Sequence, residues 1–200
     1  MSAYLRDQFP CLGITLSRLR AILRPLPQPG PEEAVSWAQA CWQLPEREFQ
    51  YVGLFSLQAA APRLPPTCLP QLRWLITTKS WWDTVDGLAT HVVGRLVLDH
   101  PGLASEMDAW VRDADIWVAR TAILHQERWK SRTDADRLFS YCELRAGDRE
   151  FFIRKAIGWA LRSYAATDPA AVEGFVLDHE PALSGLSRRE AMKGVLRHLR

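Results

Sequence analysis

The chain has 200 residues, of which 48% are hydrophobic and 24% are charged, a composition typical of a globular domain rather than of a disordered segment. The formal net charge of +2 excludes a uniformly basic DNA coat but allows a basic face that an acidic face balances. No run of about 18 apolar residues predicts a membrane span, and the N-terminus lacks the pattern of a signal peptide. We therefore expect a cytoplasmic protein.

The four cysteines, Cys11, Cys41, Cys68 and Cys142, lie far apart in the sequence. They form no CxxC pair and have no histidine at ligand spacing. This pattern predicts buried thiols in a reducing compartment rather than a zinc site or a disulfide framework. We expect neither a metal nor a cofactor.

Apolar residues recur at intervals of three and four along most of the chain, which predicts helices. The segments with this period are Glu33–Trp42, Glu46–Ala60, Leu69–Thr78, Trp81–Asp99, Ile116–Lys130 and Glu150–Ala166. Proline and glycine fall mostly between them, in a rigid loop over Pro25–Pro31, in a cluster over Pro62–Pro70 and in a break over His100–Gly102. No alternating pattern predicts a strand, so the fold class is all-α.

Three sites carry signals for the start of a helix. Asp168 precedes a proline at the first helical position, Ser187 with Glu190 forms a capping box, and Ser80 with Asp83 forms an acidic variant of that box. Helix starts recur so that pairs of helices give units of about 35–40 residues, within the range of HEAT-type repeats. We predict one α-solenoid domain over residues 1–200, curved around a concave surface.

Nine tryptophans are many for this length, and we interpret four of them, Trp37, Trp42, Trp74 and Trp110, as packing residues. Trp82 and Asp86 are different, because a spacing of four places an indole beside a carboxylate on one helix face. This pair is either a functional site or a packing tryptophan next to a carboxylate that caps a helix or pairs with an arginine.

A second segment carries an aromatic residue between two cations. Lys155, Trp159 and Arg162 have the spacing i, i+4 and i+7, so they share one helix face. Gly158 costs about 1 kcal/mol in a helix interior. Its presence predicts that a ligand or a neighbouring helix approaches the backbone closely there.

Arg120 stands in the strongly apolar segment Ile116–Leu124. A buried arginine requires a partner, which is either a phosphate or a carboxylate in the core, namely Asp83 or Asp86. The C-terminal segment Ser184–Arg200 holds one acid, Glu190, and five cations, so it is either a phosphate-contacting helix or a solvated charged helix. These cations are Arg188, Arg189, Lys193, Arg197 and Arg200.

Together these segments resemble the signature blocks of the AlkD-like DNA alkylation repair family, the HEAT-like repeat alkylpurine DNA glycosylases. The matching blocks, in colinear order, are YLRDQFPCLGI, WQLPEREFQ, TKSWWDTVD, WVARTAIL, FFIRKAIGWALRSYA and LSRREAMK. The resemblance covers nearly the whole chain. It implies a monomeric solenoid whose basic concave face holds duplex DNA.

The resemblance also implies roles for single residues. The catalytic carboxylate corresponds to Asp86, the active-site aromatics to Trp82 and Trp159, a DNA-contacting arginine to Arg120, and a further cation near the DNA backbone to Arg162. The other cations that we expect at the DNA are Lys79, Lys155, Arg188 and Arg189.

The implied function is excision of cationic N3- and N7-alkylated purines from duplex DNA, by a nucleoid-associated enzyme without metal or cofactor. Family members usually carry further helical sequence before Tyr4–Gly13, whereas only Met1–Ala3 precede it here. The alternative is therefore a non-catalytic member with a shortened N-terminus that binds DNA structure. A HEAT-type scaffold for other proteins is a third hypothesis.

Overall fold

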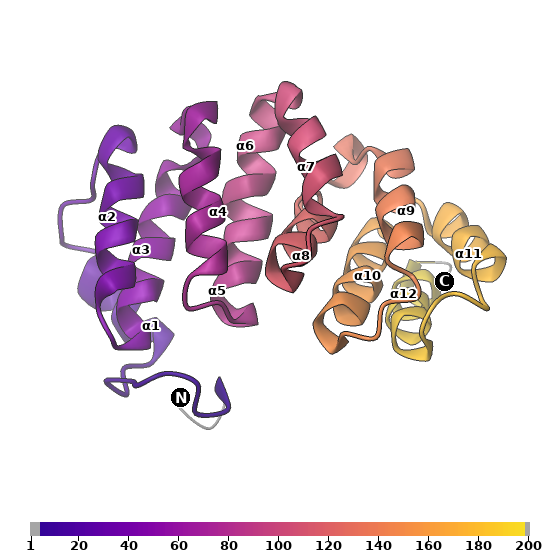
Figure 1. The fold of residues 1–200 in the computed structure, drawn as a ribbon, viewed down its shortest axis with the longest axis horizontal. Coiled ribbons are helices and arrows are strands. Elements are labelled where there is room, and N and C mark those ends of the chain that lie inside the picture. The colour runs from indigo at the N-terminus through magenta and orange to yellow at the C-terminus, as the bar shows by residue number, and fades with distance from the viewer. Residues whose placement is uncertain (1–4, 199–200) are drawn as a thin grey trace.

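The computed structural model describes residues 5–198 as a row of helices with no strand in that range, bent into an arch (Figure 1). The main helices are α1 (Leu16–Leu23), α2 (Pro31–Gln43), α3 (Arg47–Ala60), α4 (Leu69–Thr77), α5 (Trp82–Gly87), α6 (Gly94–Asp99), α7 (Ala104–Trp110), α8 (Ile116–Leu124), α9 (Ala135–Leu144), α10 (Phe151–Tyr164), α11 (Pro169–Asp178) and α12 (Gly185–His198). Shorter elements are η2 (Ala61–Arg63), η3 (Pro66–Cys68), η4 (Leu88–Val93), η5 (Pro101–Leu103) and η6 (Lys130–Arg132). The predicted all-α solenoid is confirmed.

Successive helices pack as pairs. The pairs are α2 with α3, α4 with the helix that contains α5, α7 with α8, α9 with α10, and α11 with α12. The second members of the pairs also contact one another in the order α3, α5, α8, α10 and α12. We call this row the second-helix layer, and the row of first members the first-helix layer. Each pair buries its apolar side only by stacking on its neighbours.

Three aromatic rings show that helices of the second layer run in the same direction. Trp81 directly precedes α5, Trp117 is the second residue of α8, and Phe152 is the second residue of α10. Their ring centroids lie 5.9 Å (Trp81–Trp117), 5.2 Å (Trp81–Phe152) and 4.8 Å (Trp117–Phe152) apart. The starts of α5, α8 and α10 are therefore side by side.

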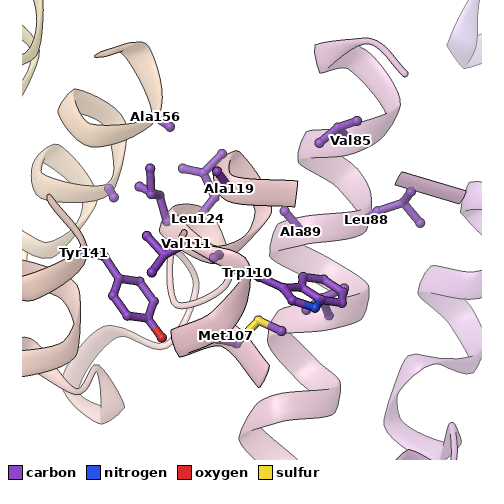
Figure 2. Close-up of a cluster of buried hydrophobic side chains, with 14 of the residues drawn as sticks. Val85, Leu88, Ala89, Met107, Trp110, Val111, Ala119, Leu124, Tyr141 and Ala156 are labelled. Carbon is purple, nitrogen blue, oxygen red and sulfur yellow. The ribbon is translucent and has the colours of Figure 1, made fainter. Parts of the chain in front are cut away.

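The apolar core lies between the two layers. Figure 2 shows Met107 and Trp110 of α7 lying toward the helix that carries Ala89. Of the four tryptophans interpreted as packing residues, Trp42 and Trp110 are buried and Trp74 packs against the core, but Trp37 is 46% exposed. The prediction for Trp37 is wrong because α3 packs against small side chains of α2 instead. A Cβ at Gly53 would meet the Ala38 Cα at 3.0 Å.

The structure differs from the predicted boundaries after α8, which ends at Leu124 rather than continuing to Lys130. The contact of His125 with Gly94 of α6 accounts for the difference, because a Cβ at Gly94 would lie 2.1 Å from the His125 carbonyl oxygen. The indole of Trp129 then donates to the Gly94 carbonyl at 2.9 Å. Packing on α6 thus turns the chain at a point where the apolar period continues.

One of the three predicted caps is confirmed. The Asp168 carboxylate accepts from the Ala171 N–H at 2.9 Å, at the start of α11. The Ser187 prediction is wrong, because α12 begins at Gly185 and Ser187 is buried inside it, donating to the Arg154 carbonyl at 2.9 Å. The hydroxyl of Ser184 accepts the Ser187 N–H at 3.0 Å in its place.

The prediction for Ser80 is also wrong. Its hydroxyl donates to the Ile76 carbonyl at 2.7 Å, at the end of α4, and Trp81 occupies the cap position of α5 without a side-chain cap. Asp83 forms no capping box because its carboxylate binds Arg47 of α3. The predicted loop that ends at Pro31 agrees with the start of α2 at that residue, and the predicted break at His100 agrees with the end of α6 at Asp99.

The segments α5, η4 and α6 form one continuous helix, with α5 at its lower end on the open side of the arch (Figure 1). The middle segment, Leu88–Val93, is a wider π-helical turn. Such turns occur often at functional sites. Here the turn begins two residues after Asp86, and Thr90 donates its hydroxyl hydrogen to the Asp86 carbonyl at 2.8 Å.

Three cysteines, Cys41, Cys68 and Cys142, are buried as predicted, whereas Cys11 is partly exposed. Between residues 5 and 198, no helix combines the length and the apolar character needed to cross a membrane.

Candidate functional site

Asp86 and Arg120 form the centre of the candidate site. The Nε and Nη2 groups of Arg120 donate to the two Asp86 carboxylate oxygens at 2.7 and 2.8 Å. The Nη1 group donates to the Phe152 carbonyl at 2.5 Å. Of the two interpretations of Arg120, the core ion pair with Asp86 is therefore the one the structure contains. All three guanidinium nitrogens have a partner within the protein, and the residue is 4% exposed.

The environment of Asp86 has two opposing electrostatic effects. Burial raises the pKa of its carboxyl, because a low-dielectric surrounding disfavours the charged form, whereas the hydrogen bonds from Arg120 favour that form. The carboxylate retains some exposure, so it reaches the surface while its orientation is fixed from below.

The indole of Trp82 lies at the first residue of α5 and is half-buried. It stands one turn before Asp86, which confirms the helical spacing that places the two on one face. Its neighbours Trp81 and Val85 turn toward the aromatic cluster and the core, respectively. The open face of α5 therefore begins with an indole and continues with a carboxylate.

Trp159 lies on α10 between residues that face two neighbouring helices. Phe152 and Ser163 face α8 and the turn that follows it, through the ring contact with Trp117 and a hydrogen bond to Glu127 at 3.0 Å. Lys155 and Arg162 face α12. At 100° per residue, Trp159 lies between these two sets, and its half-buried indole is placed at the surface of the second-helix layer. It is about two turns beyond Phe152.

A buried network fixes the start of α5. Arg47, which is fully buried, donates to both carboxylate oxygens of Asp83 at 2.5 and 2.9 Å and to the Thr84 hydroxyl at 2.8 Å. The Tyr51 hydroxyl donates to Asp83 at 2.6 Å. The sequence left Asp83 open as a partner of Arg120, and its partner is Arg47 instead.

Lys79 belongs to the same network. It adopts a positive φ of 50°, its carbonyl accepts from Arg47 at 2.8 Å, and its ammonium donates to the Leu44 carbonyl at 2.6 Å. Burial lowers the pKa of Lys79. The predicted DNA contact thus lies beside α5, but one of its ammonium hydrogens binds the protein.

The cations on α10 meet one acid on α12. Arg162 donates to the Glu190 Oε2 at 2.5 Å, and the Lys155 ammonium lies 3.5 Å from Oε1. Gly158 is the point of closest approach, since a Cβ there would lie 2.6 Å from the Glu190 Cβ. Of the two explanations for this glycine, contact with a neighbouring helix is the one that the structure shows.

The structure separates Arg188 and Arg189 from these cations. Arg188 pairs with Glu180, and both arginines border a hollow between α11 and α12. None of the other predicted DNA contacts lines this hollow. Arg200 of the same charged segment lies outside the described residues.

Four cations that line two neighbouring hollows were not predicted from the sequence as DNA contacts. They are Arg95, Lys130, Arg132 and Arg128, which borders both hollows. One of these hollows is also lined by Lys193 and Arg197 of the C-terminal charged segment, for which the sequence left a phosphate contact open. The signal was the run ERWKSR at residues 127–132, which the helical period assigned to a continuous helix. Once α8 ends at Leu124, this run forms a turn beside α10 and α12.

Among residues 5–198, no three histidine, cysteine, aspartate or glutamate side chains gather closely enough to hold a metal ion. A metal-free site remains a prediction. The groups present are a carboxylate, two indoles and several cations, which suit the stabilisation of positive charge and the binding of a polyanion.

Fold and site together define a helical-repeat protein in which one layer presents an arginine-held carboxylate, indoles and cations. The family model of DNA alkylation repair enzymes matches residues 1–195, so the chain belongs to this family. A solved structure of a predicted DNA alkylation repair enzyme from Enterococcus faecalis has 30% sequence identity and a TM-score of 0.85, and the match covers 96% of this chain and 92% of that one. A comparison with curated proteins gave no match. The family supports an enzymatic role in DNA repair, with DNA as the substrate.

Proposed function

We propose that this protein is a DNA glycosylase that hydrolyses the N-glycosidic bond of cationic N3- and N7-alkylated purines in duplex DNA. The observation that carries the proposal is the Asp86 carboxylate, held at both oxygens by Arg120 and placed one helical turn after Trp82. The family membership supports a role in the repair of alkylated DNA.

The chemistry of the substrate explains why this set of groups suffices. Alkylation at N7 of guanine or N3 of adenine makes the base a cation and weakens its bond to the sugar. As the bond breaks, positive charge develops on the deoxyribose. A fixed carboxylate stabilises that charge and orients the attacking water, and the indole faces of Trp82 and Trp159 stabilise it further. The base already carries a positive charge, so no strong general acid is required.

We assign Arg120 a different role from the phosphate contact that the resemblance implied. Its guanidinium nitrogens bind Asp86 and the Phe152 carbonyl, and almost none of its surface is exposed. Arg120 is therefore a positioning residue that holds the carboxylate. The phosphates beside the lesion would be bound by more exposed cations, of which Lys155 and Arg162 flank Trp159 on α10.

A second candidate is a family member that binds DNA structure without base release. The observation that favours it is the same ion pair, because Arg120 compensates the charge with which Asp86 would stabilise the sugar cation. A HEAT-type scaffold for other proteins is the third candidate, and it would have no salt-dependent affinity for DNA.

One experiment separates the three. The protein is incubated with methylated and with unmethylated duplex, abasic sites are converted to strand breaks by heat and alkali, and a gel-shift series over salt runs in parallel. A glycosylase gives more breaks in methylated duplex than the same treatment gives without protein, and no additional breaks in unmethylated duplex. Salt-sensitive binding without breaks would establish the structure binder and overturn the glycosylase proposal. If the protein gives neither strand breaks nor salt-sensitive binding, the HEAT-type scaffold for other proteins is the remaining candidate.

A further inference from the structure

A basic hollow of about 530 Å³ opens where α8, α10 and α12 end. Its lining contains six basic residues and one acid, Glu127. The basic residues are Arg128, Lys130, Arg162, Lys193, Arg197 and His198. The excess of cations over acids in this lining favours the binding of an anion.

A buried carboxylate organises part of this wall from behind. Glu190 is 7% exposed and lies one turn before Gly194, which also lines the hollow. Its Oε1 accepts from Lys193 at 2.8 Å and lies 3.5 Å from the Lys155 ammonium, while its Oε2 accepts from Arg162 at 2.5 Å. Hydrogen bonding from Lys193 is the main cause that lowers the pKa of Glu190.

The three cations extend outward from this single acid. The side chain of Lys193 is 62% exposed, and those of Lys155 and Arg162 are more than a third exposed, whereas Glu190 itself lies beneath them. Three positive charges around one negative charge leave a surplus of positive charge at the surface. Each cation therefore keeps N–H groups for an external anion while the buried acid restricts where it points.

Two glycines allow this arrangement. A Cβ at Gly158 would lie 2.6 Å from the Glu190 Cβ, and a Cβ at Gly194 would lie 2.6 Å from the Arg162 carbonyl oxygen. Without side chains at these positions α10 and α12 pack closely, which brings the acid of one helix under the cations of the other. The cation cluster is thus a product of the helix packing rather than of one flexible surface helix.

We propose that this hollow binds a phosphodiester group of the DNA backbone and that Glu190 is the positioning residue that orients its cations. The inference rests on the proposed DNA substrate, but it concerns binding and not base release. It extends the DNA-contacting surface from Arg162, which lies one turn of α10 beyond Trp159, to the last turn of α12.

The substitution Glu190→Gln distinguishes a positioning role from a general electrostatic effect, because the two predict opposite changes in the affinity for duplex DNA. Removing an acid beside DNA would by itself strengthen binding. If Glu190 orients the cations, binding to undamaged duplex weakens instead, by about eightfold at 0.1 M salt for each phosphate that the variant no longer binds, and the slope of log K against log salt becomes shallower by about 0.9 per phosphate. Glu143→Gln, which removes an exposed acid of α9 in the first-helix layer, is the matched control and should leave the slope unchanged.

A second pair of variants keeps the test independent of the stability of the Glu190 variant. Lys193→Met alters an exposed side chain of the hollow and should make the slope of log K against log salt shallower by about 1, whereas Arg112→Met, which removes an exposed cation in the turn after α7, should not. Equal slopes for these two variants, or a folded Glu190→Gln variant that binds as tightly as the parent, would overturn the inference. A parent protein that binds no duplex at all would overturn the proposed function as well.

Discussion

Arg120 on α8 binds both carboxylate oxygens of Asp86 on α5, at 2.7 and 2.8 Å, and its third nitrogen binds the Phe152 carbonyl on α10. The direction of the carboxylate thus depends on three successive helices of one layer being in register. The rings of Trp81, Trp117 and Phe152 pack together at the starts of the same helices and set that register.

We expect Asp86→Asn to lower the rate of 7-methylguanine release by on the order of 10²-fold or more, the effect seen when a preorganised electrostatic group is removed elsewhere. The amide keeps the shape of the side chain but loses the charge that faces the sugar cation. Single-turnover release from methylated duplex measures the effect. Asp108→Asn, which alters an acid of the first-helix layer, is the control for losing a carboxylate paired with an arginine. Equal release by the Asp86 variant and the parent would remove Asp86 from the mechanism.

Arg120→Lys should shift the acidic limb of the pH–rate profile to higher pH. The lysine keeps the positive charge but loses the two parallel N–H bonds, so the burial that raises the pKa of Asp86 is opposed less strongly. The carboxyl then takes up its proton at a higher pH, and the rate falls earlier on acidification. A lower rate with the acidic limb unchanged would indicate that Arg120 supports the fold alone.

Arg47→Met should lower the free energy of unfolding by about 3–5 kcal/mol, because it leaves the Asp83 carboxylate without its cationic partner in a largely buried setting. Arg73→Met breaks the more exposed pair with Asp113 and should cost about 1 kcal/mol or less. Denaturant unfolding of both variants provides the comparison. Similar losses would mean that the two ion pairs contribute equally in spite of their different burial.

His125 should make the protein sensitive to acid. Burial lowers its pKa to about 4, from an ordinary value near 6.5, so the unfolded chain binds a proton that the folded chain does not between these values. Its contribution to stability is complete above about pH 6.5 and is lost as the pH falls toward 4, by about 3 kcal/mol in total. His125→Gln should flatten the pH dependence of the unfolding free energy in this window. An unchanged slope would assign the acid sensitivity to other groups.

Gly158→Ala should destabilise the protein by about 1–3 kcal/mol, because the added methyl group would lie 2.6 Å from the Glu190 Cβ and 3.1 Å from the Ser187 carbonyl oxygen. Gly174→Ala, in α11, meets nothing within 4 Å and should stabilise the helix by up to about 1 kcal/mol. Thermal melts of the two variants test whether the melting temperature falls for Gly158→Ala and rises for Gly174→Ala. Stabilisation by both would show that α10 and α12 separate without cost.

The sequence by itself determined most of the helices and the placement of Trp82 beside Asp86 on one helix face. The period of three and four that places Trp82 and Asp86 on one face is a local property, because one helical turn fixes their relation whatever the helix packs against. The apolar surroundings of Arg120 likewise required a buried partner, and Asp86 was one of two candidates. Asp168 before Pro169 predicted a helix start for the same local reason.

Only the tertiary structure decided which of the alternatives holds. Asp83 and Asp86 lie on the same helix, and the choice between them depended on Arg47 of α3 binding one and Arg120 of α8 binding the other. The end of α8 at Leu124 depended on Gly94 of a different helix pair. The cations around Glu190 come from segments about 30 residues apart, which no helical period relates. Local spacing fixes geometry within one helix, whereas contacts between helices depend on how side chains of different sizes allow the layers to stack.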